Sequence, residues 1–473
     1  MGEAADTLLF RPARSARLAE LRQLLVAGGD ERTRLNPDSG RNRYGCSPLP
    51  DPELVALGSC TASTISTAGH AAAAELHQRI WLALQEEEPT QVHARESFRI
   101  RQKLLELCGL DDVAGLEVVL AASGTDAHRQ AARRLRHALG MPLHILTLNA
   151  EETGSEIPAA LAEAASEIDY VPLRHPDGAP RTPEEIDADF SRLASQAITR
   201  EQTVLLVLTD VSKTGLLAPS PALATELRLN YPHHCEVLVD ASQFRISSDT
   251  LRGYLEQDFM VVLTGSKFIG GPSFSGALLL PACVSQWLGY SESAAEVGVT
   301  PVNFGLLLRW QAALEELEAF RSLPVAQIRQ FLRAFSDRVR QRLETDPQFA
   351  YLPVNGLQRG NSDCWNELQT IFSFVPLHPD GRPLDRAATA RLHQRLQLVD
   401  AELPATLGGL RFQLGQPVNC GVRQGVPVSA LRLCSSARMV VEAHQHGLDA
   451  SIGQALSALD KLSAILKLDM RPI

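Results

Sequence analysis

The chain contains a short polar turn with the residue types that bind phosphate. Ser123-Gly124-Thr125 follows an apolar stretch, Leu116 to Ala122, and comes directly before the amphipathic stretch Asp126 to Leu139. At a junction between a strand and a helix, free backbone N–H groups and the positive end of the helix dipole attract a phosphate, and hydroxyl groups add donors. The alternative is that Ser123 only caps a helix.

A carboxylate and an amide follow a second apolar stretch. Asp240 comes directly after Glu236 to Val239, and Gln243 lies three residues further on. A carboxylate at the end of a buried strand can hold a protonated ring nitrogen, so that the ring stays cationic and withdraws electrons. An aspartate in this position can also be a cap or a turn residue.

A lysine follows a third apolar stretch. Thr264-Gly265-Ser266-Lys267 comes directly after Met260 to Leu263 and shortly before Gly270-Gly271-Pro272. A lysine that leaves a buried strand in a glycine-rich loop loses hydration, which lowers its pKa and frees the amine to form an imine with an aldehyde. A lone lysine is more often a solvated surface charge. Each of the three segments lies at the carboxyl end of a predicted strand, where ligands of open α/β sheets bind. The three segments together therefore favour a ligand site.

The elements that position these segments are short apolar strands alternating with amphipathic helices. This alternation, from Glu96 to Pro281, predicts an α/β fold with a doubly wound, mostly parallel sheet. Because the chain is too long for one ordinary core, further modules are expected on either side. The predicted strands are Leu116 to Ala122, Leu143 to Leu148, Thr203 to Leu208, Glu236 to Val239, Met260 to Leu263 and Phe274 to Leu280.

The remainder of the chain predicts an N-terminal arm and a smaller α+β domain. We place the arm with its helix at 1–90, the large domain at 91–310 and the small C-terminal domain at 311–473. No low-complexity linker separates them, so we expect rigid packing and a ligand site at the junction. The C-terminal signals are a strand from Thr370 to Val375, a helix from Ala387 to Leu398, and strands near Leu410 and Leu431.

With its three polar segments in this order, the chain resembles the class V aminotransferase and cysteine desulfurase group of pyridoxal-phosphate enzymes, which have fold type I and a seven-stranded type of sheet. The resemblance implies pyridoxal 5'-phosphate as the cofactor, held by Lys267 as a Schiff base. It implies that Asp240, the second catalytic residue, pairs with the pyridine nitrogen and that Gln243 bonds the phenolic oxygen. The phosphate contacts that it implies come from Ser123, Gly124, Thr125, Thr264 and Ser266.

The chain departs from this group at several positions. Where relatives place a histidine or an aromatic ring over the cofactor, this sequence has Glu151-Glu152-Thr153-Gly154, so Glu152 or Thr153 is expected there. Ser212 stands near the place of a cofactor-binding asparagine, and Ser266 stands where desulfurases commonly have histidine. Thr300 lies in a variant of the segment that reaches the phosphate of the neighbouring subunit, which implies a homodimer with shared active sites.

Four further residues are candidates for substrate binding or catalysis. Arg432 lies where the group keeps the arginine that binds the substrate carboxylate through two hydrogen bonds, although a surface arginine on a strand is the alternative. Cys420 is near the loop that carries the desulfurase nucleophile, and whether it is catalytic is open. Arg41 and Arg43 could meet a second anionic group on a larger substrate, or could be solvated.

The composition excludes several classes of partner. The 473 residues carry a formal net charge of -10, which argues against nucleic acid as a partner. No apolar run approaches the ~20 residues of a membrane span, so no membrane partner is expected and we predict a cytoplasmic protein. Eight cysteines are scattered without C-x-x-C pairs, which predicts reduced thiols and no metal site.

These features lead to one main hypothesis for the function. We expect an enzyme that forms an external aldimine with an L-amino acid and catalyses elimination, replacement or carbon–carbon bond formation at its side chain, in specialised metabolism. One concrete version is γ-elimination of S-adenosylmethionine with annulation onto NAD. The alternatives are a class V aminotransferase or a cysteine desulfurase-like lyase, and, from another class, a non-catalytic regulator that kept the fold.

Overall fold

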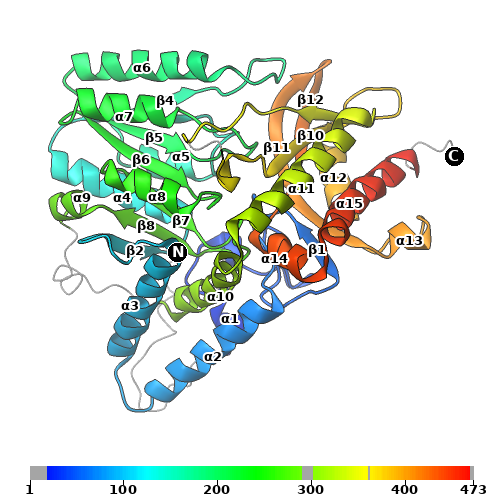
Figure 1. Cartoon of the computed structure of the whole chain (residues 1–473), viewed down its shortest axis with the longest axis horizontal. Coiled ribbons are helices and arrows are strands. Elements are labelled where there is room, and N and C mark those ends of the chain that lie inside the picture. The colour runs from blue at the N-terminus through cyan, green and yellow to red at the C-terminus, as the bar shows by residue number, and fades with distance from the viewer. Residues whose placement is uncertain (1–18, 290–301, 361–362, 469–473) are drawn as a thin grey trace, which may run out of the picture.

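The computed structural model describes residues 19–289, 302–360 and 363–468. These residues form two β-sheets with helices packed around them (Figure 1). The larger sheet comes from the middle of the chain, and the smaller one combines C-terminal strands with one strand from the N-terminal part. The predicted α/β class is confirmed.

The large sheet has seven strands in the order β2-β8-β7-β6-β5-β3-β4. Its pairs are parallel apart from those of β8, which runs antiparallel to both neighbours. All residues of β5, β6 and β7 are buried, as expected for strands that are covered on both faces. The strands are β2 (Glu117–Ala121), β3 (Leu143–Leu148), β4 (Glu167–Val171), β5 (Thr203–Thr209), β6 (Cys235–Ala241), β7 (Met260–Thr264) and β8 (Gly276–Leu280).

Six of these strands agree with the apolar stretches of the sequence, and β4 is the exception. It lies at one edge of the sheet, pairs only with β3, and is partly exposed. Its charged residues Glu167 and Asp169 interrupt the apolar pattern. An edge strand does not have to be apolar along its length, so it leaves a weaker signal in the sequence than a central strand.

Each face of the large sheet is covered by its own helices. Alternate residues of a strand point to opposite faces. Leu205 and Val207 of β5 belong to one apolar cluster, whereas Val204 and Leu206 belong to the other. The first cluster contains α4 (Gly124–Leu139), α5 (Ile157–Ala162) and α9 (Ala282–Trp287), and the second contains α6 (Pro183–Thr199), α7 (Pro221–Asn230) and α8 (Ser248–Glu256).

The small sheet has five strands in the order β1-β11-β12-β10-β9. Its edge strand β1 comes from the predicted N-terminal arm and pairs in parallel with β11, with Leu54 opposite Arg411. The N-terminal part therefore contributes directly to the sheet of the predicted C-terminal domain. The strands are β1 (Leu54–Leu57), β9 (Phe349–Leu352), β10 (Ile371–Pro376), β11 (Arg411–Arg423) and β12 (Val426–Cys434).

The remaining helices connect the two sheets and cover the small one (Figure 1). A buried ion pair between Asp210, directly after β5, and Arg359 also joins the two parts. Among the described helices, none is long and apolar enough to cross a membrane. These helices are α1 (Leu21–Leu24), α2 (Thr67–Ala83), α3 (Pro89–Cys108), α10 (Phe304–Arg321), α11 (Val325–Thr345), α12 (Arg386–Leu396), α13 (Ala405–Gly408), α14 (Ala437–His446) and α15 (Leu448–Leu468), with the short 3-10 helices η2 (Glu31–Thr33) and η4 (Trp365–Glu367).

Candidate active site

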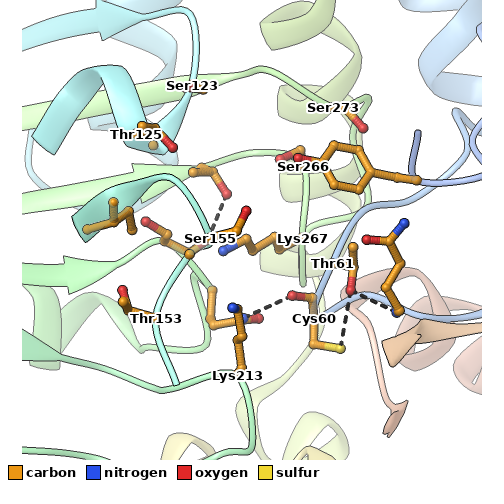
Figure 2. A pocket seen from close by; sticks show the side chains of 18 of the residues that line it. Cys60, Thr61, Ser123, Thr125, Thr153, Ser155, Lys213, Ser266, Lys267 and Ser273 are labelled. Carbon is orange, nitrogen blue, oxygen red and sulfur yellow. Dashed lines mark hydrogen bonds between the residues drawn. The ribbon is translucent and has the colours of Figure 1, made fainter. Parts of the chain in front are cut away.

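One cavity of about 260 Å³ lies where the carboxyl ends of the central strands meet the small sheet and the N-terminal part. Lys267 extends into its middle, with Thr125, Thr153 and Ser266 around it (Figure 2). The structure therefore brings together residues that are far apart in the sequence. The predicted site residues that line the cavity are Ser123, Gly124, Thr125, Asp240, Gln243, Thr264, Ser266, Lys267 and Arg432.

The amino end of α4 opens into this cavity. Ser123 is the N-cap of the helix: its Oγ accepts a hydrogen bond from the Asp126 N–H at 3.2 Å and donates to the Asp126 carboxylate at 2.8 Å. A glycine makes the close packing of this turn possible, because a Cβ on Gly276 would lie 2.5 Å from the carbonyl carbon of Ser123. The backbone N–H groups of the first helical turn are thus held at the edge of the cavity, where an anion can reach them.

Asp240 is a buried carboxylate at the end of β6. Its Oδ1 accepts hydrogen bonds from the N–H and the hydroxyl of Ser242. His128 of α4 faces the other oxygen, with Nε2 3.6 Å from Oδ2. Burial by itself would raise the pKa of Asp240, but the charges of His128 and Lys267 and the bonds from Ser242 outweigh it and hold this pKa below its usual value. Asp240 is therefore kept ionised in an enclosed position.

Lys267 is partly buried, and its amine forms no hydrogen bond with any described residue. Burial lowers its pKa, and the charges of Asp240 and Cys60 oppose that effect only in part. The surrounding loop needs its glycines, since a Cβ on Gly265 or on Gly271 would lie 2.5 Å from the Cβ of Ala313 in α10. Close packing of the loop on this helix fixes the position from which the lysine enters the cavity.

Two predicted cofactor contacts already have partners inside the protein. The amide nitrogen of Gln243 donates to the Cys60 carbonyl at 3.1 Å, and the hydroxyl of Thr264 donates to the Ser242 carbonyl at 2.7 Å. Both side chains line the cavity while they hold neighbouring loops together. The second amide hydrogen of Gln243 is left to bind a ligand.

The loop that follows β3 does not supply a ring over the cavity. The Glu152 carboxylate is buried and accepts hydrogen bonds from the hydroxyls of Ser212 at 2.7 Å and Thr214 at 2.8 Å. It therefore organises the loop after β5. Ser212 does not line the cavity, because its hydroxyl is directed at Glu152. Thr153 does line it, and its buried hydroxyl has no hydrogen-bond partner.

Arg432 of β12 is almost fully buried at the side of the cavity. Its guanidinium donates to the carbonyl of Gln416 at 2.7 Å, the hydroxyl of Thr61 at 2.8 Å and the carbonyl of Lys213 at 3.3 Å. Among the described residues, no carboxylate forms an ion pair with it. A guanidinium at the wall of a cavity that has no carboxylate partner in the protein can bind the carboxylate of a ligand.

The structure separates the remaining candidates. Arg41 is paired with Asp51 at 2.9 Å and does not line the cavity, whereas Arg43 lies at its exposed rim. Cys420 is outside the cavity lining, and burial raises the pKa of its thiol, so a thiolate is disfavoured there. Thr300 lies outside the described residues.

No protein-family model matches the sequence, and no curated protein matches it. Among solved structures, a cysteine desulfurase from Escherichia coli has a TM-score of 0.55 at 16% identity, over 91% of this chain and 99% of that chain. A glutamate decarboxylase domain from Vibrio parahaemolyticus gives 0.56 at 13%, over 89% and 81%. A structure of SPT with a PLP internal aldimine gives 0.52 at 16%, over 87% and 88%. The chain has fold type I. The predicted fold class is confirmed.

The cavity of this fold type I chain fits the cofactor that the resemblance implies. The hydroxyls of Thr153 and Thr209 line it, and neither of these buried atoms has a hydrogen-bond partner among the described residues. Buried polar atoms are rarely left unpaired, so they indicate a missing ligand. A helix amino end, a buried carboxylate and a buried amine suit a phosphate, a cationic ring and an aldehyde respectively.

Two residues of the fold type I site are not indicated by the sequence alone. His128 lies one helical turn after the phosphate turn, and its Nδ1–H donates to the Gly124 carbonyl at 2.7 Å. Its position on the buried face of α4 is typical of an ordinary core residue. Only the packing of α4 on β7 and β8 brings it to Asp240, which ends the neighbouring strand β6. Lys213 is a second lysine in the cavity, and its sequence context, a polar loop, is typical of a surface charge.

Proposed function

We propose that the chain is a pyridoxal-phosphate-dependent enzyme that acts on an L-amino acid. The observation that carries this proposal is the meeting of Lys267, Asp240 and the amino end of α4 at one cavity. In this cavity the buried hydroxyls of Thr153 and Thr209 lack hydrogen-bond partners among the described residues. The solved structure of SPT with a PLP internal aldimine, which has the same fold, supports the choice of cofactor. A regulator that kept the fold would have no chemical need for all three features.

Each group of the chain has a role that follows from its surroundings. When bound, the cofactor supplies an aldehyde for imine formation and an electron-withdrawing ring. Ser123, Gly124, Thr125 and Ser266 would hold its phosphate, and Gln243 its phenolic oxygen. Lys267 gives up its proton more readily than a solvated lysine, because burial lowers its pKa, and this favours imine formation. Asp240, ionised and oriented by His128, would keep a proton on the ring nitrogen.

The substrate side of the cavity supports an amino acid. Arg432 would bind the α-carboxylate of the substrate through its guanidinium. This contact would determine which bond at the α-carbon stands perpendicular to the plane of the cofactor ring. The wall near Thr153 carries no ring, so the reacting face is more open than an aromatic group would leave it. This openness supports chemistry at the substrate side chain, such as elimination, replacement or carbon–carbon bond formation.

The cavity also bears on more specific versions of the function. No contact among the described residues is specific for a sulfonium group or for NAD, so γ-elimination of S-adenosylmethionine with annulation onto NAD stays a prediction. A class V aminotransferase remains compatible with the cavity. A desulfurase-like use of Cys420 is disfavoured, because that residue does not line the cavity. A homodimer with shared active sites is proposed from the resemblance alone.

The cofactor assignment can be tested with the purified protein. We expect a yellow protein with pyridoxal phosphate, whose visible absorption is lost on borohydride reduction, and we expect mass spectrometry to find the pyridoxyl group on Lys267. Lys267→Ala should abolish the labelling, whereas Lys467→Gln, a change at an exposed lysine, should not. A pyridoxyl group on Lys213 would overturn the assignment. A panel of amino acids then tests the activity, and a spectrum that responds to none of them would favour the regulator.

A further inference from the structure

Lys213 is a second lysine that reaches the same cavity as Lys267. It lies in the loop after β5 and extends toward Lys267 from the opposite side (Figure 2). Its Nζ donates one hydrogen bond, to the carbonyl of Ala150 at 2.9 Å. This bond uses one N–H of the amine, and the other two N–H groups have no hydrogen-bond partner among the described residues.

The charges around the cavity do not balance. Five basic residues line it, against the carboxylates of Glu152 and Asp240 and the thiol of Cys60. Burial would raise the pKa of Cys60, but its hydrogen bond with Cys434 and the charge of Arg432 lower that pKa to about 5. Glu152 is already occupied by Thr214 and Arg174, and Asp240 faces His128. Arg32, one of the basic residues, has its own partner in Asp30. The other basic residues are Arg43, Lys213, Lys267 and Arg432.

Within this set, Lys213 and Arg432 are two neighbouring cations that have no carboxylate in ion-pair contact among the described residues. The guanidinium of Arg432 donates to the backbone carbonyl of Lys213 at 3.3 Å, so it lies beside the residue that carries the second positive group. Neither forms an ion pair with a carboxylate of the described residues. Burial, Arg432 and Lys267 together lower the pKa of Lys213 to about 8. Unpaired cations so close together repel each other, and an anionic ligand relieves that repulsion.

One α-carboxylate carries a single negative charge against the two positive charges of Arg432 and Lys213. Arg432 already donates to Gln416, Thr61 and Lys213, and one N–H of its guanidinium is left for the carboxylate. The amine of Lys213, held on the Ala150 carbonyl, then still faces the interior without an anion. We propose that Lys213 binds a second anionic group at the end of the substrate side chain; this proposal rests on the proposed function. The substrates would then be acidic amino acids. The same two cations disfavour a substrate with a cationic side chain, such as a sulfonium compound.

The first test compares acidic amino acids with their uncharged amides. The protein loaded with pyridoxal phosphate is titrated with L-glutamate, L-glutamine, L-aspartate and L-asparagine, and Kd is taken from the visible spectrum. Lys213→Gln should weaken binding of the two acidic amino acids about 10- to 100-fold and change binding of the amides less than about 2-fold, the range of one charged hydrogen bond. Lys467→Gln, at an exposed lysine, is the matched control and should change neither. Arg432→Lys should weaken all four ligands.

The possible outcomes separate the two proposals. If the amides bind the wild-type protein as well as the acidic amino acids do, or if Lys213→Gln weakens both kinds equally, the second anionic site is wrong while the proposed function stands. If S-adenosylmethionine binds more tightly than L-glutamate, the acidic substrate class is wrong. If no amino acid changes the spectrum, the proposed function fails. Anion binding to the apoprotein then tests the site at Lys213 separately.

The apoprotein gives a measurement that does not depend on the cofactor. Calorimetry with glutarate, which has two carboxylates and no amine, should show binding that Lys213→Gln weakens. A bound anion raises the pKa of Lys213, so at pH 8 binding should take up as much as about half a proton, and at pH 6 almost none, because the amine is already protonated there. The groups whose charges act on Lys213 are Arg432, Lys267, Glu152 and Glu151. No binding of glutarate, or the same proton uptake in Lys213→Gln, would overturn the proposal.

Discussion

At the scale of single residues, the pair of Asp240 and His128 decides how the proposed cofactor ring would be held. Asp240 is buried, yet its pKa is held below the ordinary value because His128, Lys267 and Ser242 stabilise the ionised form. The His128 ring is oriented in turn by its bond to the Gly124 carbonyl. The phosphate turn and the carboxylate are therefore coupled through one side chain, and a change in the turn would also disturb Asp240.

We predict that Asp240→Ala lowers turnover far more than it lowers cofactor occupancy. The phosphate contacts and Lys267 remain in the variant, so cofactor binding should lose only the about 1.5–3 kcal/mol of one charged hydrogen bond. Turnover should fall about 10²- to 10³-fold, because a preorganised charge that stabilises the transition state is removed. Cofactor Kd and kcat, measured on the same preparation, test the difference. Unchanged turnover would show that the carboxylate has another role.

At the scale of elements, the glycine-rich loop after β7 and the helix α10 determine where Lys267 lies. Gly265 and Gly271 both pack against Ala313, and the Gly271 N–H donates to the Gly265 carbonyl at 2.9 Å. The Trp310 indole N–H donates to the Gly276 carbonyl at 3.0 Å and holds the start of β8 to the same helix. The sequence shows the glycines, but the reason for them is the helix that packs on the loop.

We predict that Gly265→Ala destabilises the protein and displaces Lys267. The new Cβ would lie 2.5 Å from the Cβ of Ala313, and overpacking of this kind costs about 1–3 kcal/mol of unfolding free energy. Urea unfolding and the cofactor spectrum measure the two effects. The double variant Gly265→Ala with Ala313→Gly should recover much of the loss. Gly253→Ala, where nothing lies within 4 Å, is the control and should be neutral or slightly stabilising.

At the scale of the whole molecule, the cavity depends on all parts of the chain. Its lining combines Thr61 from the N-terminal part, Asp240 and Lys267 from the large sheet, and Arg432 from the small sheet. The buried pair of Asp210 and Arg359 ties the end of β5 to the C-terminal part. The relative position of the two sheets therefore determines whether Arg432 and Lys267 line the same cavity.

The proposed homodimer can be tested by complementation. If Thr300 contacts the phosphate in the neighbouring subunit, each active site needs two chains. Mixing inactive Lys267→Ala with an inactive Thr300→Ala variant should then restore activity to some sites, because a heterodimer contains one intact site. Activity after unfolding and refolding of the mixed chains measures this. If two folded, inactive parents give no recovery, each site is complete within one chain.

The sequence alone determined the class of the fold and the core of the candidate site. The central strands are fully buried and read as apolar stretches, and each functional segment directly follows one of them, so Ser123, Asp240 and Lys267 could be placed at strand ends. Parallel strands bring such ends to one edge of the sheet, which is why local patterns were sufficient.

Only the tertiary structure decided the parts of the site that depend on contacts between distant segments. The Glu152 carboxylate turned out to bond Ser212 and Thr214, because the loops after β3 and β5 are neighbours. His128 and Lys213 have the sequence context of a core residue and a surface lysine. Their roles arise from the packing of α4 on β7 and β8 and from the position of the small sheet beside the cavity. Hydrophobic patterning within one segment contains no information about either.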